Sequence, residues 1–262
     1  MARARPVEIG IRIMKTLVIA NQKGGVGKTS TLVHLAFDFA ERGLKVAVID
    51  LDTQGNASFT LGVHKSEIAA SSLFGDVAGF DLAPIDNIAV IAADGRLADL
   101  EKLALEDAAT AFRASIAQIA AQGFDVCLID TAPSLGNAMA SALLAADFVA
   151  SPIELEAYAL QGIKKMNSTI AAIKKANAKL QFLGMIPSKV DGRNPRHTRH
   201  LAELLAAYPA LIMPTPIGYR SSIADALASH CPVWEIRKTS ARAATKEVRA
   251  MTQHIHDKME IA

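Results

Sequence analysis

Residues 23–29 read Lys-Gly-Gly-Val-Gly-Lys-Thr, between an apolar run at 15–20 (Lys-Thr-Leu-Val-Ile-Ala) and a helix-like segment at 29–42. This order of strand, glycine-rich loop and helix is the context in which a loop binds phosphate. The glycines let the backbone curl so that successive N–H groups point at one anion, and the helix adds its unpaired N-terminal amides and its dipole. We therefore predict a phosphate-binding loop made of Lys23, Gly24, Gly25, Val26, Gly27, Lys28, Thr29 and Ser30.

Outward from this loop, short apolar runs alternate with helical segments. The predicted strands are 15–20, 45–50, 88–92, 125–130, 148–151, 181–186 and a short one at 211–213. The predicted helices are 29–42, 108–121, 156–176 and 240–260. Such alternation is typical of a mostly parallel, twisted sheet with helices on both faces. We predict an α/β fold, a single-domain P-loop NTPase over residues 15–262, preceded by an N-terminal extension over residues 1–14.

Two more predicted strands end in aspartates. The run 45–50 leads into Asp50-Leu-Asp52-Thr-Gln-Gly-Asn, and the run Phe-Asp-Val-Cys-Leu-Ile-Asp ends at Asp130. Ligands of open parallel sheets bind at the carboxyl ends of the strands, where the loop at 21–28 also lies. We predict that Lys28 contacts the β- and γ-phosphates of a nucleotide, and that Mg²⁺ is bound by Thr29 with Asp130 and Asp52 beside it.

Composition excludes several classes of protein. Of 262 residues, 51% are hydrophobic and 21% are charged, as in an ordinary globular domain. The apolar stretches are shorter than the roughly 18 residues of a membrane span, and the basic N-terminus lacks the apolar core of a signal peptide. The two cysteines, Cys127 in a predicted strand and Cys231 before Pro232, indicate neither a disulfide framework nor a metal site. We expect a cytoplasmic protein.

The phosphate loop departs from the generic G-x-x-x-x-G-K-[ST] pattern, because Gln22 stands where glycine is usual and Lys23 precedes the glycines. In both respects the chain resembles the ParA/MinD family of deviant Walker A ATPases, and most of all the ParA/Soj-type partition ATPases. The resemblance implies ATP and Mg²⁺ as cofactors and a catalytic set of Lys23, Lys28 and Asp52. Lys23 would reach the nucleotide of a partner subunit, so hydrolysis would depend on dimerisation. Asp52 would orient water and Asp50 would be structural, with Thr53 in place of the family's proline.

The resemblance extends to two further segments. The stretch 154–162 (Glu-Leu-Glu-Ala-Tyr-Ala-Leu-Gln-Gly) resembles the family segment before a long helix, which we interpret as dimer-facing and regulatory. The stretch 185–193 corresponds to the strand end near the adenine, and Pro216, in Pro-Thr-Pro, is expected to form part of the base's other wall. The choice of ATP over GTP rests on the resemblance, since no Asn-Lys-x-Asp guanine motif occurs.

Basic residues gather in the last third of the chain. Between residues 189 and 249 there are ten Lys or Arg against five Asp or Glu, although the net charge of the whole chain is only +2. Two arginines match positions where partition ATPases contact DNA, and the others are their neighbours: Arg193 and Arg220, then Arg196, Arg199, Lys246 and Arg249. Contacts to phosphates would be salt-dependent and independent of sequence.

The resemblance implies a partition ATPase of plasmids or chromosomes: an ATP-dependent homodimer that associates with the nucleoid and is stimulated by a ParB-like centromere-binding protein. A positioning ATPase for a non-DNA cargo would share every motif. A MinD-like membrane regulator would need an amphipathic tail, but the stripe Val248, Met251, Ile255 and Met259 contains no aromatic residue, so we expect a helix docked on the core. An iron–sulfur carrier would need paired cysteines.

Overall fold

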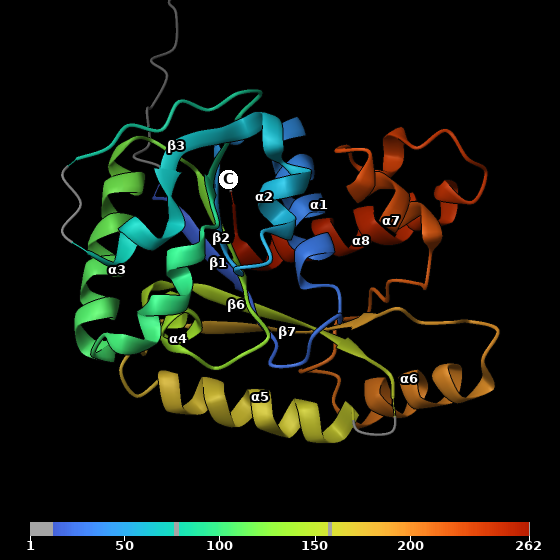
Figure 1. Cartoon of the computed structure of the whole chain (residues 1–262). Helices are drawn as coiled ribbons and strands as arrows, with labels where there is room; N and C mark the ends of the chain where they lie inside the picture. Colours follow the sequence, from blue (N-terminus) through green and yellow to red (C-terminus); the bar gives the residue numbers. More distant parts are fainter. Residues whose placement is uncertain (1–12, 76–78, 157–158, 262) are drawn as a thin grey trace, which may run out of the picture.

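The computed structural model describes residues 13–75, 79–156 and 159–261. Within them, seven parallel strands form one sheet in the order β3-β4-β2-β5-β1-β6-β7 (Figure 1). The strands are β1 (Lys15–Ile19), β2 (Val46–Leu51), β3 (Lys65–Ala69), β4 (Ile88–Ala92), β5 (Val126–Thr131), β6 (Phe148–Glu154) and β7 (Gln181–Ser188). The predicted fold class is confirmed.

Helices cover both faces of this sheet. They are α1 (Lys28–Glu41), α2 (Asn56–Thr60), α3 (Leu105–Ala121), α4 (Asn137–Ala145), α5 (Ala159–Ile173), α6 (Pro195–Ala207), α7 (Ser221–Ala228) and α8 (Ala241–Met259). Short 3₁₀ segments are η1 (Gly62–His64), η2 (Ala70–Phe74), η3 (Gly95–Lys102) and η4 (Val233–Glu235). Figure 1 shows α1, α7 and α8 on one side of the sheet and α3 and α4 on the other.

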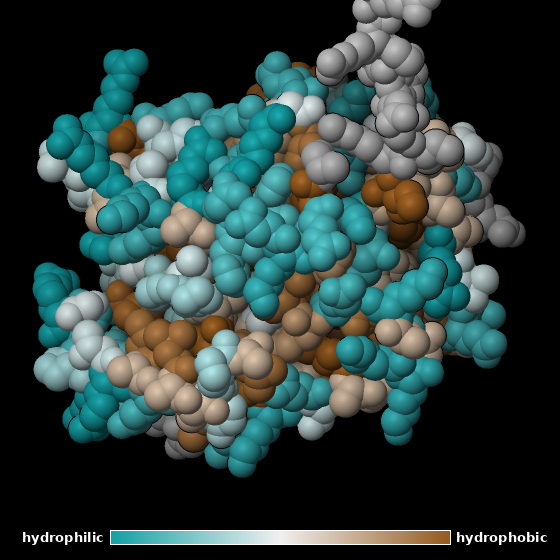
Figure 2. Space-filling model, turned by 180° about the vertical axis from the view of Figure 1, so that it is seen from behind, coloured by the Kyte–Doolittle hydropathy of each residue, from teal (hydrophilic) through white to brown (hydrophobic). Residues whose placement is uncertain are grey.

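The central strand β1 shows why the sheet is buried on both faces. Leu17 and Ile19 point into a core shared with α1, α7 and α8, whereas Val18 points into a core shared with α3, α4 and α5. Because side chains alternate along a strand, a strand between two helical layers is apolar at most positions. The face of the molecule seen in Figure 2 is largely hydrophilic, with smaller hydrophobic patches between polar side chains.

The strand register places the predicted acidic residues Asp50 and Asp130 opposite each other on neighbouring strands. Ile19 lies opposite Asp130, and Asp130 lies opposite Asp50 on the next strand. The chain leaving β1 therefore enters the phosphate loop directly beside Asp130, with Asp50 one strand further away. In-register parallel strands are thus what assembles the site.

Several elements differ from the sequence-based expectation. Strand β3 was not predicted because it is a half-exposed edge strand, Lys-Ser-Glu-Ile-Ala, without an apolar run. The short helices α2, α4 and α7 were not predicted either. The start of α6 carries a recognisable signal in Asn194 before Pro195: the Asn194 side chain accepts a hydrogen bond from the Arg196 N–H at 3.0 Å. The stretch 211–213 makes only one β-bridge, Met185 with Ile212.

Two further expectations concern the ends of the chain. Met14 is buried in the core, while most of the predicted extension over residues 1–14 lies outside the described residues. In α8 the predicted apolar stripe is fully docked: Val248, Met251, Ile255 and Met259 are all buried. Among the described residues, no helix has the length and apolarity needed to cross a bilayer. The stripe on α8 packs on the core, as expected.

Candidate functional site

The glycine-rich loop joins β1 to α1 through two left-handed residues, Gly25 (φ +75°) and Gly27 (φ +99°). An L side chain at Gly27 would be strained, and its Cβ would lie 3.3 Å from the Ser30 hydroxyl. Lys28 folds back over the loop and donates a hydrogen bond to the Lys23 carbonyl at 3.2 Å. Burial lowers the pKa of Lys28, while Asp130 and Asp52 oppose that shift. The loop thus presents backbone N–H groups and one enclosed ammonium.

A buried hydroxyl–carboxylate pair lies beside the loop. The Thr29 hydroxyl donates to Asp130 Oδ2 at 2.7 Å. Burial and the neighbouring Asp50 carboxylate raise the pKa of Asp130 to about 7, while the Thr29 hydrogen bond and Lys28 oppose that rise. Asp130 is thus a buried acid whose charged form would be favoured by an additional cation close to Thr29.

These groups fit Mg²⁺. A hydroxyl and a buried carboxylate are oxygen donors of the type that Mg²⁺ prefers. Within the described ranges, no group of three or more His, Cys, Asp or Glu side chains is arranged to hold a metal ion. A Mg²⁺ ion at Thr29 would therefore take most of its ligands from water and phosphate oxygens, which is its usual behaviour in phosphoryl-transfer sites.

The two aspartates at the end of β2 differ in their contacts: Asp50 lies within the strand, and Asp52 follows it. Asp50 is buried and accepts hydrogen bonds from the Ser58 N–H (2.8 Å), the Ser58 hydroxyl (2.7 Å) and the Asp52 N–H (3.1 Å). These bonds fix the turn that follows β2, in agreement with a structural role. Asp52 is partly exposed, accepts only a local bond from the Gln54 N–H at 3.0 Å, and lines the pocket at the loop. Its other carboxylate oxygen, Oδ2, makes no hydrogen bond to the described residues and can accept one from a water molecule.

A pocket of about 760 Å³ opens at the loop, within the range typical of small-molecule sites. Its floor includes the loop residues from Gly24 to Thr31, apart from Val26, and Asp52. Its other wall is made by Ser188, Lys189 and residues 217–220. The predicted base-wall residue Pro216 does not line the pocket, but Ile217, the next residue, does. Lys189 was not predicted as a site residue.

Lys23 lies at the exposed end of the loop and is held by carboxylates of its own chain. Its ammonium donates to Glu156 Oε2 at 2.5 Å and to Glu154 Oε2 at 2.9 Å. The hydrogen bond to Glu156 is the main reason that the pKa of Lys23 is raised. Glu154 Oε1 lies 3.1 Å from the Lys189 ammonium. Sequence analysis placed Glu154 and Glu156 in a regulatory segment but gave no signal for these contacts.

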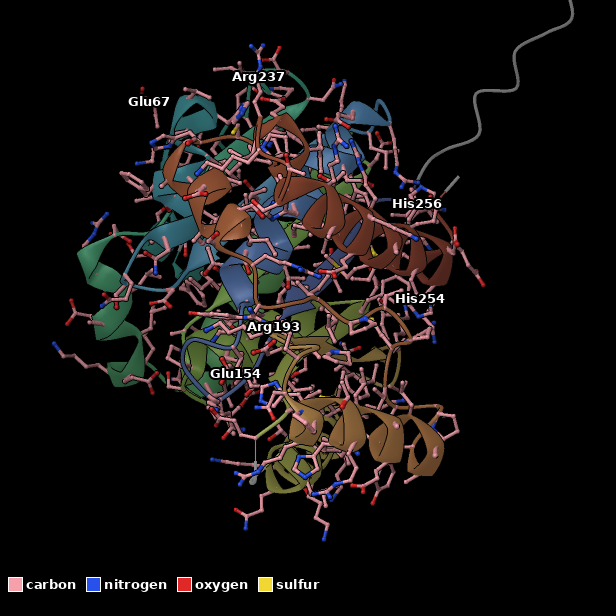
Figure 3. All side chains as sticks on the ribbon, turned by 90° about the vertical axis from the view of Figure 1, so that its right-hand side faces the viewer. Glu67, Glu154, Arg193, Arg237, His254 and His256 are labelled. Atoms are coloured by element: carbon pink, nitrogen blue, oxygen red, sulfur yellow. The ribbon has the colours of Figure 1, made fainter. Side chains whose placement is uncertain are left out.

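The predicted DNA-contacting residues fall into three groups. Arg193 and Arg220 line one surface hollow, although Arg220 is ion-paired with Glu247 at 2.5 Å. Arg196, Arg199 and Lys246 are exposed, with Arg199 3.7 Å from Glu203. Arg249 instead faces α1, where it pairs with Asp38 and Glu41 and stacks on Trp234 with 3.5 Å between its guanidinium carbon and the ring centroid. Glu154 and Arg193 are both labelled in Figure 3.

Hydrogen bonds of His34 connect α1 to η4. His34 contacts the Ser30 carbonyl through Nδ1 at 2.7 Å, and its Nε2 accepts from the Val233 N–H at 3.2 Å. Burial, helped by the Arg249 charge, lowers the pKa of His34 to about 4. Since Nε2 must accept a hydrogen bond, the imidazole is neutral in this arrangement. Ser30 and Arg249 were predicted as site residues, but no role was predicted for His34 or Val233.

The chain is similar to known proteins over nearly all its length. The family model for an AAA domain matches residues 14–182. Protein IncC of Escherichia coli is 62% identical over 267 residues, which cover 98% of this chain and 73% of that protein. The chromosome-partitioning ATPase Soj of Thermus thermophilus is 32% identical over 84% of this chain and 89% of its own. The structure of a Cyanothece McdA–ATP complex superposes with a TM-score of 0.79 at 25% identity, covering 92% of this chain and 96% of the other.

Proposed function

This chain belongs to the ParA/Soj-type partition ATPases, and from that premise we propose that ATP and Mg²⁺ join two copies of it into a dimer that hydrolyses ATP. The observation that carries the proposal is the position of the two loop lysines. Lys28 is enclosed in the loop, whereas Lys23 has 49% of its side chain exposed at the loop's outer end. A cation that its own loop does not enclose can serve the nucleotide of a second copy.

Within each subunit, the described residues divide the work. Backbone N–H groups from Gly24 to Gly27 and the Lys28 ammonium bind the phosphates. Thr29 would hold Mg²⁺ through its hydroxyl, whose orientation is fixed by the hydrogen bond to Asp130, and the ion would supply positive charge at the phosphoryl oxygens. Asp52 orients the attacking water. Intrinsic turnover is slow in this scheme, since the site is complete only when Lys23 of the second copy and a stimulating partner are in place.

For the cargo we propose DNA bound without sequence preference, with a ParB-like centromere-binding protein as the stimulating partner and the nucleoid as the place of action. Arg193 and Arg220 share one hollow, and Arg196, Arg199 and Lys246 add exposed charge. Contacts from these residues to DNA phosphates would position the protein on the duplex without reading its sequence. A dimer doubles the patch, so binding would strengthen in the ATP state.

The test of the two-subunit site is Lys23→Gln. We expect this variant to bind ATP with wild-type affinity and to lose partner-stimulated hydrolysis, because the glutamine is polar but carries no positive charge. Fluorescent nucleotide titration and stimulated phosphate release measure the two properties. Equal stimulated rates in the variant and the wild type would remove the trans role of Lys23.

Two alternatives give different results in simple assays. A membrane-attached regulator would need α8 to leave the core, where Val248, Met251, Ile255 and Met259 are buried; ATP-dependent sedimentation with liposomes would favour it. A positioning ATPase for a non-DNA cargo uses the same nucleotide site. Absence of salt-sensitive DNA binding by the ATP-bound protein would favour that second alternative.

A further inference from the structure

The outer lysine of the phosphate loop is held by two carboxylates of its own subunit. Lys23 contacts Glu154 and Glu156 at 2.9 and 2.5 Å, and Glu154 contacts Lys189 at 3.1 Å. The four side chains form a cluster with equal numbers of positive and negative charges. Glu154 is mostly buried, with 16% of its side chain exposed, whereas Glu156 is 57% exposed. One carboxylate is therefore part of the fold and the other can return to solvent.

The sheet brings this cluster together. β6 lies beside β1, with Ile19 opposite Ala150, so the chain leaving β6 runs next to the loop leaving β1. Asn21 links the phosphate loop to β6 by hydrogen bonds. Its side-chain amide donates to the Pro152 carbonyl at 2.7 Å, and its side-chain oxygen accepts from the Lys23 N–H at 2.8 Å. The backbone of Lys23 is thereby fixed close to the end of β6. The meeting of Lys23 with Glu154 is built into the fold.

Lys189 fixes the orientation of Glu154. It follows β7 in a left-handed conformation (φ +54°), uncommon for lysine, and lines the nucleotide pocket. Its ammonium lies 3.9 Å from where a Cβ on Gly25 would be, so it packs against the phosphate loop. Each oxygen of Glu154 then has its own lysine: Oε1 has Lys189 and Oε2 has Lys23. When Lys23 leaves, Glu154 keeps one cation and is not left unpaired.

We propose that Glu154 and Glu156 form a latch that holds Lys23 in its own subunit, and that the latch must open before Lys23 can act on the nucleotide of a second copy. This proposal rests on the trans role of Lys23 given above. Both carboxylates act as positioning residues, because they contact the lysine and not the nucleotide. Each dimer contains two such lysines, so the free energy of opening counts twice in dimer formation.

A different role for the same residues predicts the opposite effect. If Glu154 and Glu156 were attractive contacts to a second copy, their neutralisation would weaken the dimer. If they hold Lys23 in place, neutralisation strengthens the dimer. An exposed ion pair is worth a factor of up to about five in an equilibrium constant. With a factor of about three for each latch, Glu156→Gln should tighten the ATP-dependent dimer about tenfold.

The first test examines the latch without nucleotide or dimer. An amine reacts with acylating reagents in its neutral form, and two carboxylates hold Lys23 charged. In the nucleotide-free protein, Glu156→Gln and Glu154→Gln should each raise the acetylation rate of Lys23 severalfold, measured by mass spectrometry against all other lysines. Asp99→Asn is the matched control: Asp99 pairs with Lys102 at 2.6 Å on the exposed η3 segment, and its loss should affect Lys102 alone. An unchanged Lys23 rate in both glutamate variants overturns the latch.

The second test measures the dimer with a non-hydrolysable ATP analogue and Mg²⁺ by sedimentation velocity. The dimer dissociation constant should fall about tenfold in Glu156→Gln, and that gain should vanish in the Lys23→Gln background. A weaker dimer, or an equal gain without Lys23, contradicts the latch even if the dimer itself forms. Failure of the wild type to dimerise with the analogue refutes the proposed two-subunit site, whereas the acetylation test still decides whether Lys23 is held in its own subunit.

Discussion

The two sides of the phosphate loop hold their charged groups in different ways. On the inner side, Lys28, Thr29 and Asp130 are enclosed between β1, β5 and α1, and Asp130 is only 1% exposed. On the outer side, Lys23 has half of its side chain in solvent and is paired with Glu154 and Glu156. We call these groups the inner and outer regions. Burial strengthens the electrostatic interactions of the inner region and fixes its geometry. Exposure leaves the outer region able to exchange partners.

This difference matches two demands of a two-subunit site. Groups that stabilise developing charge within one subunit work best when they are oriented before the reaction. A lysine that has to reach another subunit must be able to leave its first partners, so its pairing must be weak. Substitution of an enclosed group should therefore have a larger effect than substitution of an exposed group that can exchange partners.

The largest effect is expected for Thr29→Val, which keeps the shape of the inner region but removes the hydroxyl bonded to Asp130. Loss of the Mg²⁺ ligand should lower kcat for ATP hydrolysis on the order of 10³-fold, the scale of removing a preorganised electrostatic group. ATP binding should also lose its dependence on Mg²⁺. Lys23→Gln, from the outer region, should keep that dependence in the same titration. A Mg²⁺ response in Thr29→Val equal to that of the wild type would show that the inner region is misassigned.

A smaller effect is expected from pH, through His34 on the inner face of α1. Its pKa is about 4 in the folded chain and about 6.5 when exposed, so between these values the unfolded state binds more protons. Stability is therefore fully present above pH 6.5 and falls as pH drops toward 4, by on the order of 3 kcal/mol. Urea unfolding of the wild type and of His34→Gln across this window isolates the contribution. An equal pH slope in both proteins would mean that His34 is not held neutral.

Sequence analysis reached the inner region because its signals are local. The loop at 21–28 has its own motif, and Asp50 and Asp130 end apolar runs whose parallel register aligns them. The outer region depends on pairs far apart in the chain: Lys23 and Glu154 are separated by 131 positions. No periodicity or motif records such a pair, and β3 was missed for a similar reason, because edge strands lack the apolar run of buried ones. Burial likewise explains why Arg249 does not lie where it was expected. Its positive charge predicted a DNA contact at the surface, but the residue pairs with Asp38, whose side chain is fully buried.

The smallest effect is expected at the basic residues, where Arg220 and Arg249 repeat the contrast between exchangeable and fixed partners. Arg220 pairs with the partly exposed Glu247, so its side chain can turn to a DNA phosphate instead. Arg220→Ala should therefore weaken DNA binding of the ATP-bound protein about tenfold at low salt. It should also make that binding less dependent on salt concentration. Glu247→Gln is the matched control, because it frees the same arginine and should leave binding equal or stronger.

Arg249→Ala should instead lower stability by about 1–2 kcal/mol, since it leaves Asp38 buried without one of its two arginines. Fluorescence anisotropy over a salt series and thermal unfolding separate the two effects. DNA binding that is lost in Arg249→Ala and kept in Arg220→Ala would reverse the assignment, and would place the DNA-contacting face against α1 rather than at the hollow of Arg193.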